Sequence, residues 1–132
     1  MESILNYAAE ILLLLFLIIT FLQSSIDKVF DWNGNLSWLT AHFADTPLKN
    51  AVPILLGTVL LAEMAAGTLC AVGLYQIVIM GKSGIAFYGA IMSCVSLLML
   101  LFGQRMAKDY EGAKTISVYF IPAIFLVFLL QG

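Results

Sequence analysis

The sequence has few charged side chains, and this scarcity decides its broad class. Only 11% of its residues are charged, whereas soluble domains average about 25%. Apolar residues, counted with tyrosine and cysteine, make up 62% of the chain. The net charge of −2 is that of neither a nucleic-acid-binding surface nor a polybasic lipid anchor. These values exclude nucleic acid as a partner and predict one compact domain embedded in a lipid bilayer.

Cysteine and histidine are also scarce, which restricts metal and redox chemistry. The two cysteines, Cys70 and Cys94, lie far apart in apolar segments and form no C-x-x-C pair. We therefore favour a packing role for them over a disulfide or redox role. His42 is the only histidine, which excludes a haem held by two histidines and argues against a multi-histidine metal site. No metal and no resident cofactor are expected.

Four long apolar segments are each close to the roughly 20 residues that a helix needs to cross a bilayer. Backbone groups in lipid must be satisfied within the structure that crosses it, and the alternation of a barrel strand is absent, so the segments are predicted to be helices. The N-terminus lacks the basic region of a signal peptide, and the first segment is expected to be retained. The predicted fold class is all-α: a single domain over residues 1–132, a polytopic four-helix transmembrane bundle with helices over about 4–26, 51–78, 84–103 and 114–131.

The first loop is long and is expected to be partly helical. Residues 31–35, Asp-Trp-Asn-Gly-Asn, have the composition of a turn. Ser37 is placed to cap a short helix that begins at Trp38. Such a loop would cover one end of the bundle. Amphipathic aromatic rings suit the headgroup layer, and the predicted membrane-interface anchors are Trp32, Trp38, Tyr110 and Tyr119.

Small residues recur at four-residue spacing in the second and third helices. This spacing lets two helix backbones approach closely in lipid, where packing drives helix association. We favour packing within the bundle, and self-association of two copies through the same faces is the alternative. The predicted packing residues are Gly57, Ala62, Ala66, Gly67, Ala71, Gly89 and Ser93.

Glu63 is the one acidic residue near the middle of an apolar segment. An ionised side chain at this depth costs roughly 2.5–3.5 kcal/mol on insertion scales, so it must be protonated, paired or turned toward a polar interior. We predict a polar funnel that opens toward the first and third loops and ends at this carboxylate. The alternative is a protonated acid that only locks the helices together, with the cations contacting lipid headgroups. The predicted intramembrane polar site comprises Glu63, Lys28, Asp27, Gln23, Gln104 and Arg105.

Positive charge gathers on the side of the first and third loops, and the opposite side holds Lys82 alone. The positive-inside rule then places these two loops in the cytoplasm, with both termini outside. The first loop is net acidic and rich in tryptophan, however, and cations that pair with acids do not report topology. Both orientations therefore stay open.

Three stretches of the sequence resemble one family of membrane proteins. They are LQSSIDKVFDW, LLGTVLLAEMAAGTLCAVGL, and RMAKDYEGAK before YFIPAIF. Over nearly its whole length the chain is similar to the DoxX-like integral membrane proteins, which include DoxD, a subunit of archaeal thiosulfate:quinone oxidoreductase, and MauE, which assists amine dehydrogenase maturation. Ser25 stands where the family usually has a glycine, three positions before Lys28. The family's second-helix pattern is matched at Gly57, Glu63, Gly67 and Gly73.

The resemblance implies a multi-pass protein of the cytoplasmic (inner) membrane of a prokaryote, near redox chemistry but without a catalytic mechanism of its own. Relatives with thioredoxin-like partners suggest disulfide chemistry, against which the missing C-x-x-C argues. We therefore expect a non-catalytic subunit or assembly partner of a larger membrane complex, or a homo-oligomer. One alternative is a quinone-handling subunit of a membrane oxidoreductase, in which Glu63 exchanges a proton with the quinone. The other is a small proton-coupled carrier.

Overall fold

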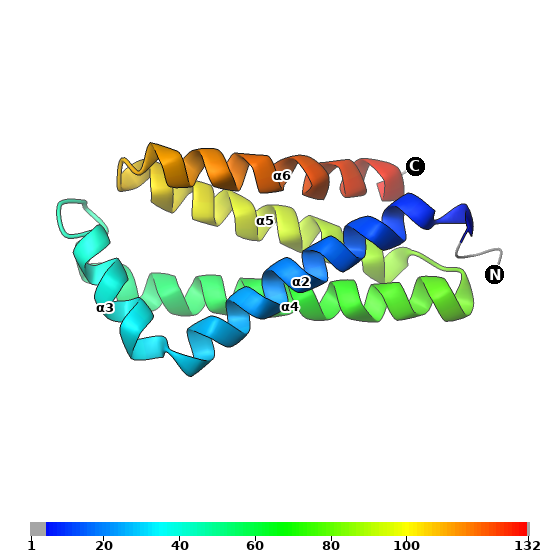
Figure 1. The fold of residues 1–132 in the computed structure, drawn as a ribbon, viewed down its shortest axis with the longest axis horizontal. Coiled ribbons are helices and arrows are strands. Elements are labelled where there is room, and N and C mark those ends of the chain that lie inside the picture. Colours follow the sequence, from blue (N-terminus) through cyan, green and yellow to red (C-terminus); the bar gives the residue numbers. More distant parts are fainter. Residues whose placement is uncertain (1–4, 132) are drawn as a thin grey trace.

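The computed structural model describes residues 5–131, which form an elongated bundle of helices (Figure 1). The long helices are α2 (Ala8–Phe30), α4 (Val52–Met80), α5 (Gly84–Met106) and α6 (Tyr110–Gln131). The connection between α2 and α4 holds α3 (Trp32–His42) and the short 3₁₀ helix η1 (Lys49–Ala51). No strand occurs within the described residues, so the predicted all-α four-helix bundle is confirmed.

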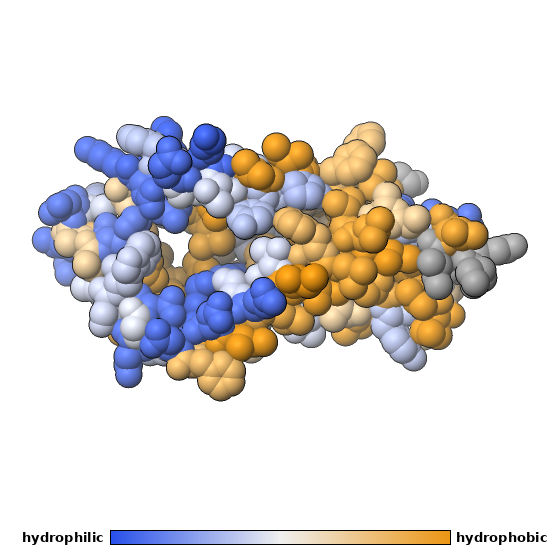
Figure 2. Space-filling model, viewed as in Figure 1, coloured by the Kyte–Doolittle hydropathy of each residue, from blue (hydrophilic) through white to orange (hydrophobic). Residues whose placement is uncertain are grey.

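Four segments have the length and hydropathy of membrane spans: Ala8–Phe30, Lys49–Met80, Gly84–Met106 and Tyr110–Gln131. Their outer surfaces expose large apolar side chains such as Leu12, Ile54 and Phe128. Figure 2 shows that apolar residues dominate the half of the molecule away from α3, whereas hydrophilic residues gather at the α3 end. An apolar surface of this extent is solvated by lipid tails and not by water. The chain is a multi-pass membrane protein.

α4 is the central helix of the bundle. It joins the antiparallel α5 through a tight turn at Gly81, whose φ of 70° is the left-handed conformation that glycine favours at a helix C-terminus. α6 returns along α5, and α2 packs on α4, whereas the contact between α2 and α6 is much less extensive. Figure 1 shows α2 tilted, crossing in front of α4. The tilt moves the C-terminal end of α2 away from α6, so α3 closes the polar end of the bundle.

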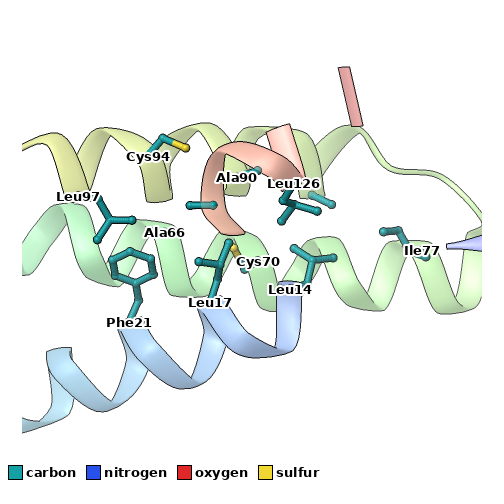
Figure 3. Close-up of a cluster of buried hydrophobic side chains, with 12 residues drawn as sticks. Leu14, Leu17, Phe21, Ala66, Cys70, Ile77, Ala90, Cys94, Leu97 and Leu126 are labelled. Carbon is teal, nitrogen blue, oxygen red and sulfur yellow. The ribbon is translucent and has the colours of Figure 1, made fainter. Parts of the chain in front are cut away.

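The core combines large side chains from α2 with very small ones from α4 and α5. Leu14, Leu17 and Phe21 extend from α2 toward the centre (Figure 3). Gly73 and Gly89 bring α4 and α5 into backbone contact. A Cβ on Gly73 would lie 2.5 Å from the Cα of Ala86, and one on Gly89 would lie 2.9 Å from the nitrogen of Cys70. The small residues therefore set the distance between these two helices.

The predicted packing residues divide into two groups. Those buried inside the bundle are Ala66, Gly67, Gly89 and Ser93, and those only half-buried are Gly57, Ala62 and Ala71. Gly67 gives room to Leu22, whose Cδ2 would lie 2.6 Å from an added Cβ, and a Cβ added to Gly57 would lie 3.9 Å from the Cη2 of Trp32. Because the buried small residues are used within one chain, the structure favours packing inside the bundle over self-association through these faces.

The helix boundaries differ from the prediction mainly at the polar end. α2 continues to Phe30 instead of ending near residue 26, and α5 continues to Met106 instead of ending near residue 103. α6 begins earlier, at Tyr110 instead of near residue 114. The helices therefore run on past the apolar core into polar sequence, which hydropathy alone does not follow. Ile4, the predicted start of the first helix, lies outside the described residues.

The first loop is more helical than predicted. α3 begins at Trp32, so the predicted turn over residues 31–35 is wrong, and Ser37 lies inside the helix instead of capping it. The amide of Asn35 donates Nδ2–H to the carbonyl of Asp31 at 2.8 Å. This bond gives a turn-favouring side chain a partner one turn away while its backbone stays helical.

Candidate functional site

Glu63 lies on the inner face of α4 and is only 1% exposed. The Nζ of Lys28, near the C-terminal end of α2, lies 3.0 Å from its Oε1 and also donates to the Oγ of Ser24 at 2.6 Å. Ser24 and Lys28 are four residues apart and therefore share one helix face. Of the three states expected for a carboxylate at this depth, the structure has the paired one. Removing either charge would leave the other without its partner in a medium of low dielectric constant.

A cavity of about 560 Å³ opens at the polar end of the bundle, between α3, α4 and α5. Most of its wall is apolar, with Leu56 and Val59 from α4 and Val95 and Met99 from α5. Its polar wall residues are Lys28, Asn35, His42 and Gln104. Figure 2 shows an opening at this end of the molecule. Ligand pockets are typically about 300–1,000 Å³ with a few placed polar groups, so the cavity suits a mainly apolar molecule.

The predicted polar funnel differs from this cavity in two respects. The wall is mainly apolar, and Lys28 lines it whereas Glu63 does not. The side chain of Lys28 is 17% exposed, against 1% for Glu63. Lys28 therefore lines the cavity, and its ammonium pairs with a carboxylate that lies outside the cavity wall. Glu63 is not part of the cavity wall, and its predicted proton exchange with a ligand stays a prediction.

His42 is a wall residue whose role the sequence did not predict. Its Nε2 lies 3.1 Å from the Oε1 of Gln104 and 3.5 Å from the Oδ2 of Asp109. Both neighbouring oxygens can accept a hydrogen bond, and the tautomer with its hydrogen on Nε2 can donate to them. The ring also stacks on Trp38, with the two centroids 4.5 Å apart. These contacts fasten α3 to the ends of α5 and α6, and no local pattern connects residues so far apart in the sequence.

Replacing His42 with alanine is expected to loosen α3. The variant loses the contacts with Gln104 and Asp109, so amide hydrogen exchange in residues 32–42 should accelerate on the order of tenfold, which corresponds to about 1.4 kcal/mol of local stability. Hydrogen-exchange mass spectrometry in detergent measures this rate. Thr40→Ala is the matched control, because the Thr40 hydroxyl bonds only within α3, to the carbonyl of Leu36 at 2.7 Å. Equal exchange in the two variants would contradict the fastening role.

The other predicted site residues do not bond to the Lys28–Glu63 pair. Gln104 stands at the rim of the cavity with His42. Gln23 and Asp27 line a second groove, of about 450 Å³, between α2 and α6. Arg105 is exposed, and its guanidinium lies 5.2 Å above the ring of Tyr110. Within residues 5–131, Lys28 is the member of the predicted set that pairs with Glu63, and Arg105, Asp27, Gln23 and Gln104 form no ion pair or hydrogen bond with it.

The four predicted interface anchors lie in different settings. Trp38 and Tyr110 are exposed at the polar end, where an anchor belongs. Trp32 is half-buried with its ring over Gly57. Tyr119 lies near the middle of α6 and lines the α2–α6 groove beside Phe16, with the ring centroids 6.0 Å apart. Its position inside the span makes the prediction of an interface anchor wrong for Tyr119.

The fold and this site define a class: a four-helix, multi-pass membrane protein with a Lys–Glu pair inside the bundle and an apolar cavity beside it. Comparison of the chain with protein-family models, curated proteins and solved structures finds no match. The DoxX-like resemblance therefore stays a prediction from the sequence.

Proposed function

We propose that this chain binds a neutral, lipid-soluble molecule of the quinone class in the cavity between α3, α4 and α5, as a subunit of a larger membrane complex. The observation that carries the proposal is the position of Lys28, which lines a mainly apolar cavity while its ammonium lies 3.0 Å from a buried carboxylate. In this role the chain binds and orients the ligand, and a partner subunit supplies the electrons.

The surroundings of the cavity support a ligand that arrives from the hydrocarbon layer. Leu98 and Phe102 of α5 line the cavity and are also 51% and 61% exposed on the outer surface of the bundle. Lipid tails would contact these side chains, so a molecule dissolved in the membrane reaches the cavity without crossing water. A ligand with an apolar ring and tail would replace those lipid contacts with the aliphatic wall.

The charge at the inner wall supports a neutral head group. Lys28 is already paired with Glu63, so a carboxylate or phosphate would meet a neutralised cation with a second negative charge behind it. A carbonyl oxygen avoids that repulsion and accepts an N–H from the ammonium, which has three hydrogens and gives one of them to Ser24. His42 and Gln104 supply further polar groups at the outer rim. A quinone ring has two carbonyl oxygens on an otherwise apolar body, which matches this distribution.

Quinone binding is expected to quench the fluorescence of Trp38, which lines the cavity. In a Trp32→Phe background, decylubiquinone should bind about tenfold more tightly than decylbenzene, since the benzene ring offers no acceptor to Lys28 and tenfold equals about 1.4 kcal/mol. Val59→Phe fills the cavity and should weaken quinone binding at least as much. Val72→Phe places the same change on an exposed, lipid-facing position of α4 and should have no effect.

Two outcomes would contradict the proposed ligand class: equal affinity for the quinone and the alkylbenzene, or equal quenching in Val59→Phe and Val72→Phe. The proposed setting is the cytoplasmic membrane of a prokaryote, as the DoxX-like resemblance implies. There the native protein should co-purify in mild detergent with a larger membrane partner. A lone chain that keeps its whole cellular function would contradict the proposed role as a subunit.

A further inference from the structure

Two buried polar side chains of the bundle have atoms without a hydrogen-bond partner. Among the described residues, Ser25, Glu63, Ser93 and Ser96 are the buried polar or charged ones. The hydroxyls of Ser25 and Ser93 donate to the carbonyls one turn before them, at 2.7 and 2.8 Å. The Oε1 of Glu63 and the Oγ of Ser96 have no such partner within residues 5–131. Lys28 approaches Oε1 to 3.0 Å, but not with the angles of a hydrogen bond.

The register of α4 and α5 places these two residues opposite each other. Gly73 faces Ala86, and Gly89 faces Cys70. Because α4 and α5 are antiparallel, the residue number on one helix falls by as much as the number on the other rises from one facing pair to the next. Continuing the same register brings Ser96 opposite Glu63. Both positions are fully buried, as the inner seam of a helix pair requires, with exposures of 0% and 1%.

The two helices separate at this level. Figure 1 shows α5 diverging from α4 toward the α3 end, and the cavity opens between them there. Val59 is one turn from Glu63, and Met99 is about one turn from Ser96, and both line that cavity. The facing pair therefore lies at the point where direct backbone packing ends. A water molecule is the smallest polar ligand that can bridge two facing side chains at such a point.

We propose that Glu63 and Ser96 together bind a buried water molecule, which completes the hydrogen bonding of the carboxylate. The water donates one hydrogen to Oε1 of Glu63 and accepts the hydroxyl hydrogen of Ser96, so both unpartnered atoms are satisfied. Buried waters of this kind usually make about three hydrogen bonds and are costly to remove. With Lys28 from α2 and the water from the α5 side, the carboxylate of α4 has partners from two neighbouring helices. The water site does not depend on the proposed quinone.

Infrared spectroscopy of the ligand-free protein in phosphatidylcholine bilayers tests this site. The carboxylate stretching band of Glu63 is identified by its loss in Glu63→Gln. Ser96→Ala should shift this band and remove one O–H stretching band that is sensitive to H₂¹⁸O. Ser96→Thr, which keeps the hydroxyl, should restore both. Ser93→Ala is the matched control, because Ser93 is equally buried on the same helix and its hydroxyl already bonds to Gly89.

Each remaining outcome overturns the proposal. If Ser96→Ala and Ser93→Ala shift the Glu63 band equally, the effect is one of packing alone. If Ser96→Ala shifts the carboxylate band without loss of an ¹⁸O-sensitive band, the serine bonds the carboxylate directly and no water lies between them. If neither band changes in Ser96→Ala, the two residues do not share a ligand.

Discussion

Replacing Lys28 with methionine is expected to destabilise the bundle by about 3 kcal/mol or more, because it leaves a buried carboxylate without its cation. Glu63 is 1% exposed, so water cannot replace the ammonium as the partner of its charge. Methionine keeps the length and apolar character of the lysine stem, so the loss reports the charge and not the packing. Unfolding by SDS in mixed micelles, followed by circular dichroism, measures the change.

The double variant Lys28→Met/Glu63→Gln should recover most of that stability, since no unpaired charge remains. Glu63→Gln alone should cost less than Lys28→Met, because Lys28 is 17% exposed and its ammonium can turn to water. Lys82→Met is the control: Lys82 is exposed at the opposite end of the bundle and forms no ion pair with the described residues. Equal stability of Lys28→Met and Lys82→Met would show that the pair contributes nothing.

Replacing Gly73 with alanine is expected to separate α4 from α5, at a cost of about 2 kcal/mol. The new Cβ would lie 2.5 and 2.6 Å from the Cα and nitrogen of Ala86, and backbone cannot move aside as a flexible side chain can. The shift would propagate along the seam to Glu63. The same SDS unfolding measurement applies.

Gly84→Ala provides the comparison for that substitution. Gly84 begins α5, and a Cβ there would meet nothing within 4 Å. This variant should be as stable as the native chain or slightly more stable, because alanine favours a helix more than glycine does. Equal destabilisation of the two variants would mean that the loss comes from the glycines' flexibility and not from close packing at Gly73.

The position of Lys28 changes the role assigned to Glu63, the acid inside the second membrane span. A carboxylate deep in a membrane segment is by default read as the functional group. Here Lys28 lines the cavity, whereas Glu63, its ion-pair partner, does not. The proposed role of Glu63 is therefore to hold Lys28 in place, and substitutions at Glu63 act on a ligand through the position of that ammonium. The sequence could not show which of Lys28 and Glu63 lines the cavity. Both side chains are charged, and the tilt of α2 decides which of them lies deeper in the bundle.

The sequence alone determined that the chain is a helical membrane protein with four spans and a single acid deep inside the second. These properties are local: hydropathy over about 20 residues and the 3.6-residue helix period decide them. The same local information does not decide which of several cations reaches the acid. Lys28 and Arg105 were equal candidates, and only the crossing of α2 over α4 brings Lys28 to Glu63 while Arg105 lies over Tyr110. Two further features also depend on the tertiary structure. One is the register of α4 and α5, which places Ser96 opposite Glu63, and the other is the contact of His42 with Asp109. In both, the packing of whole helices sets the distance between the two residues.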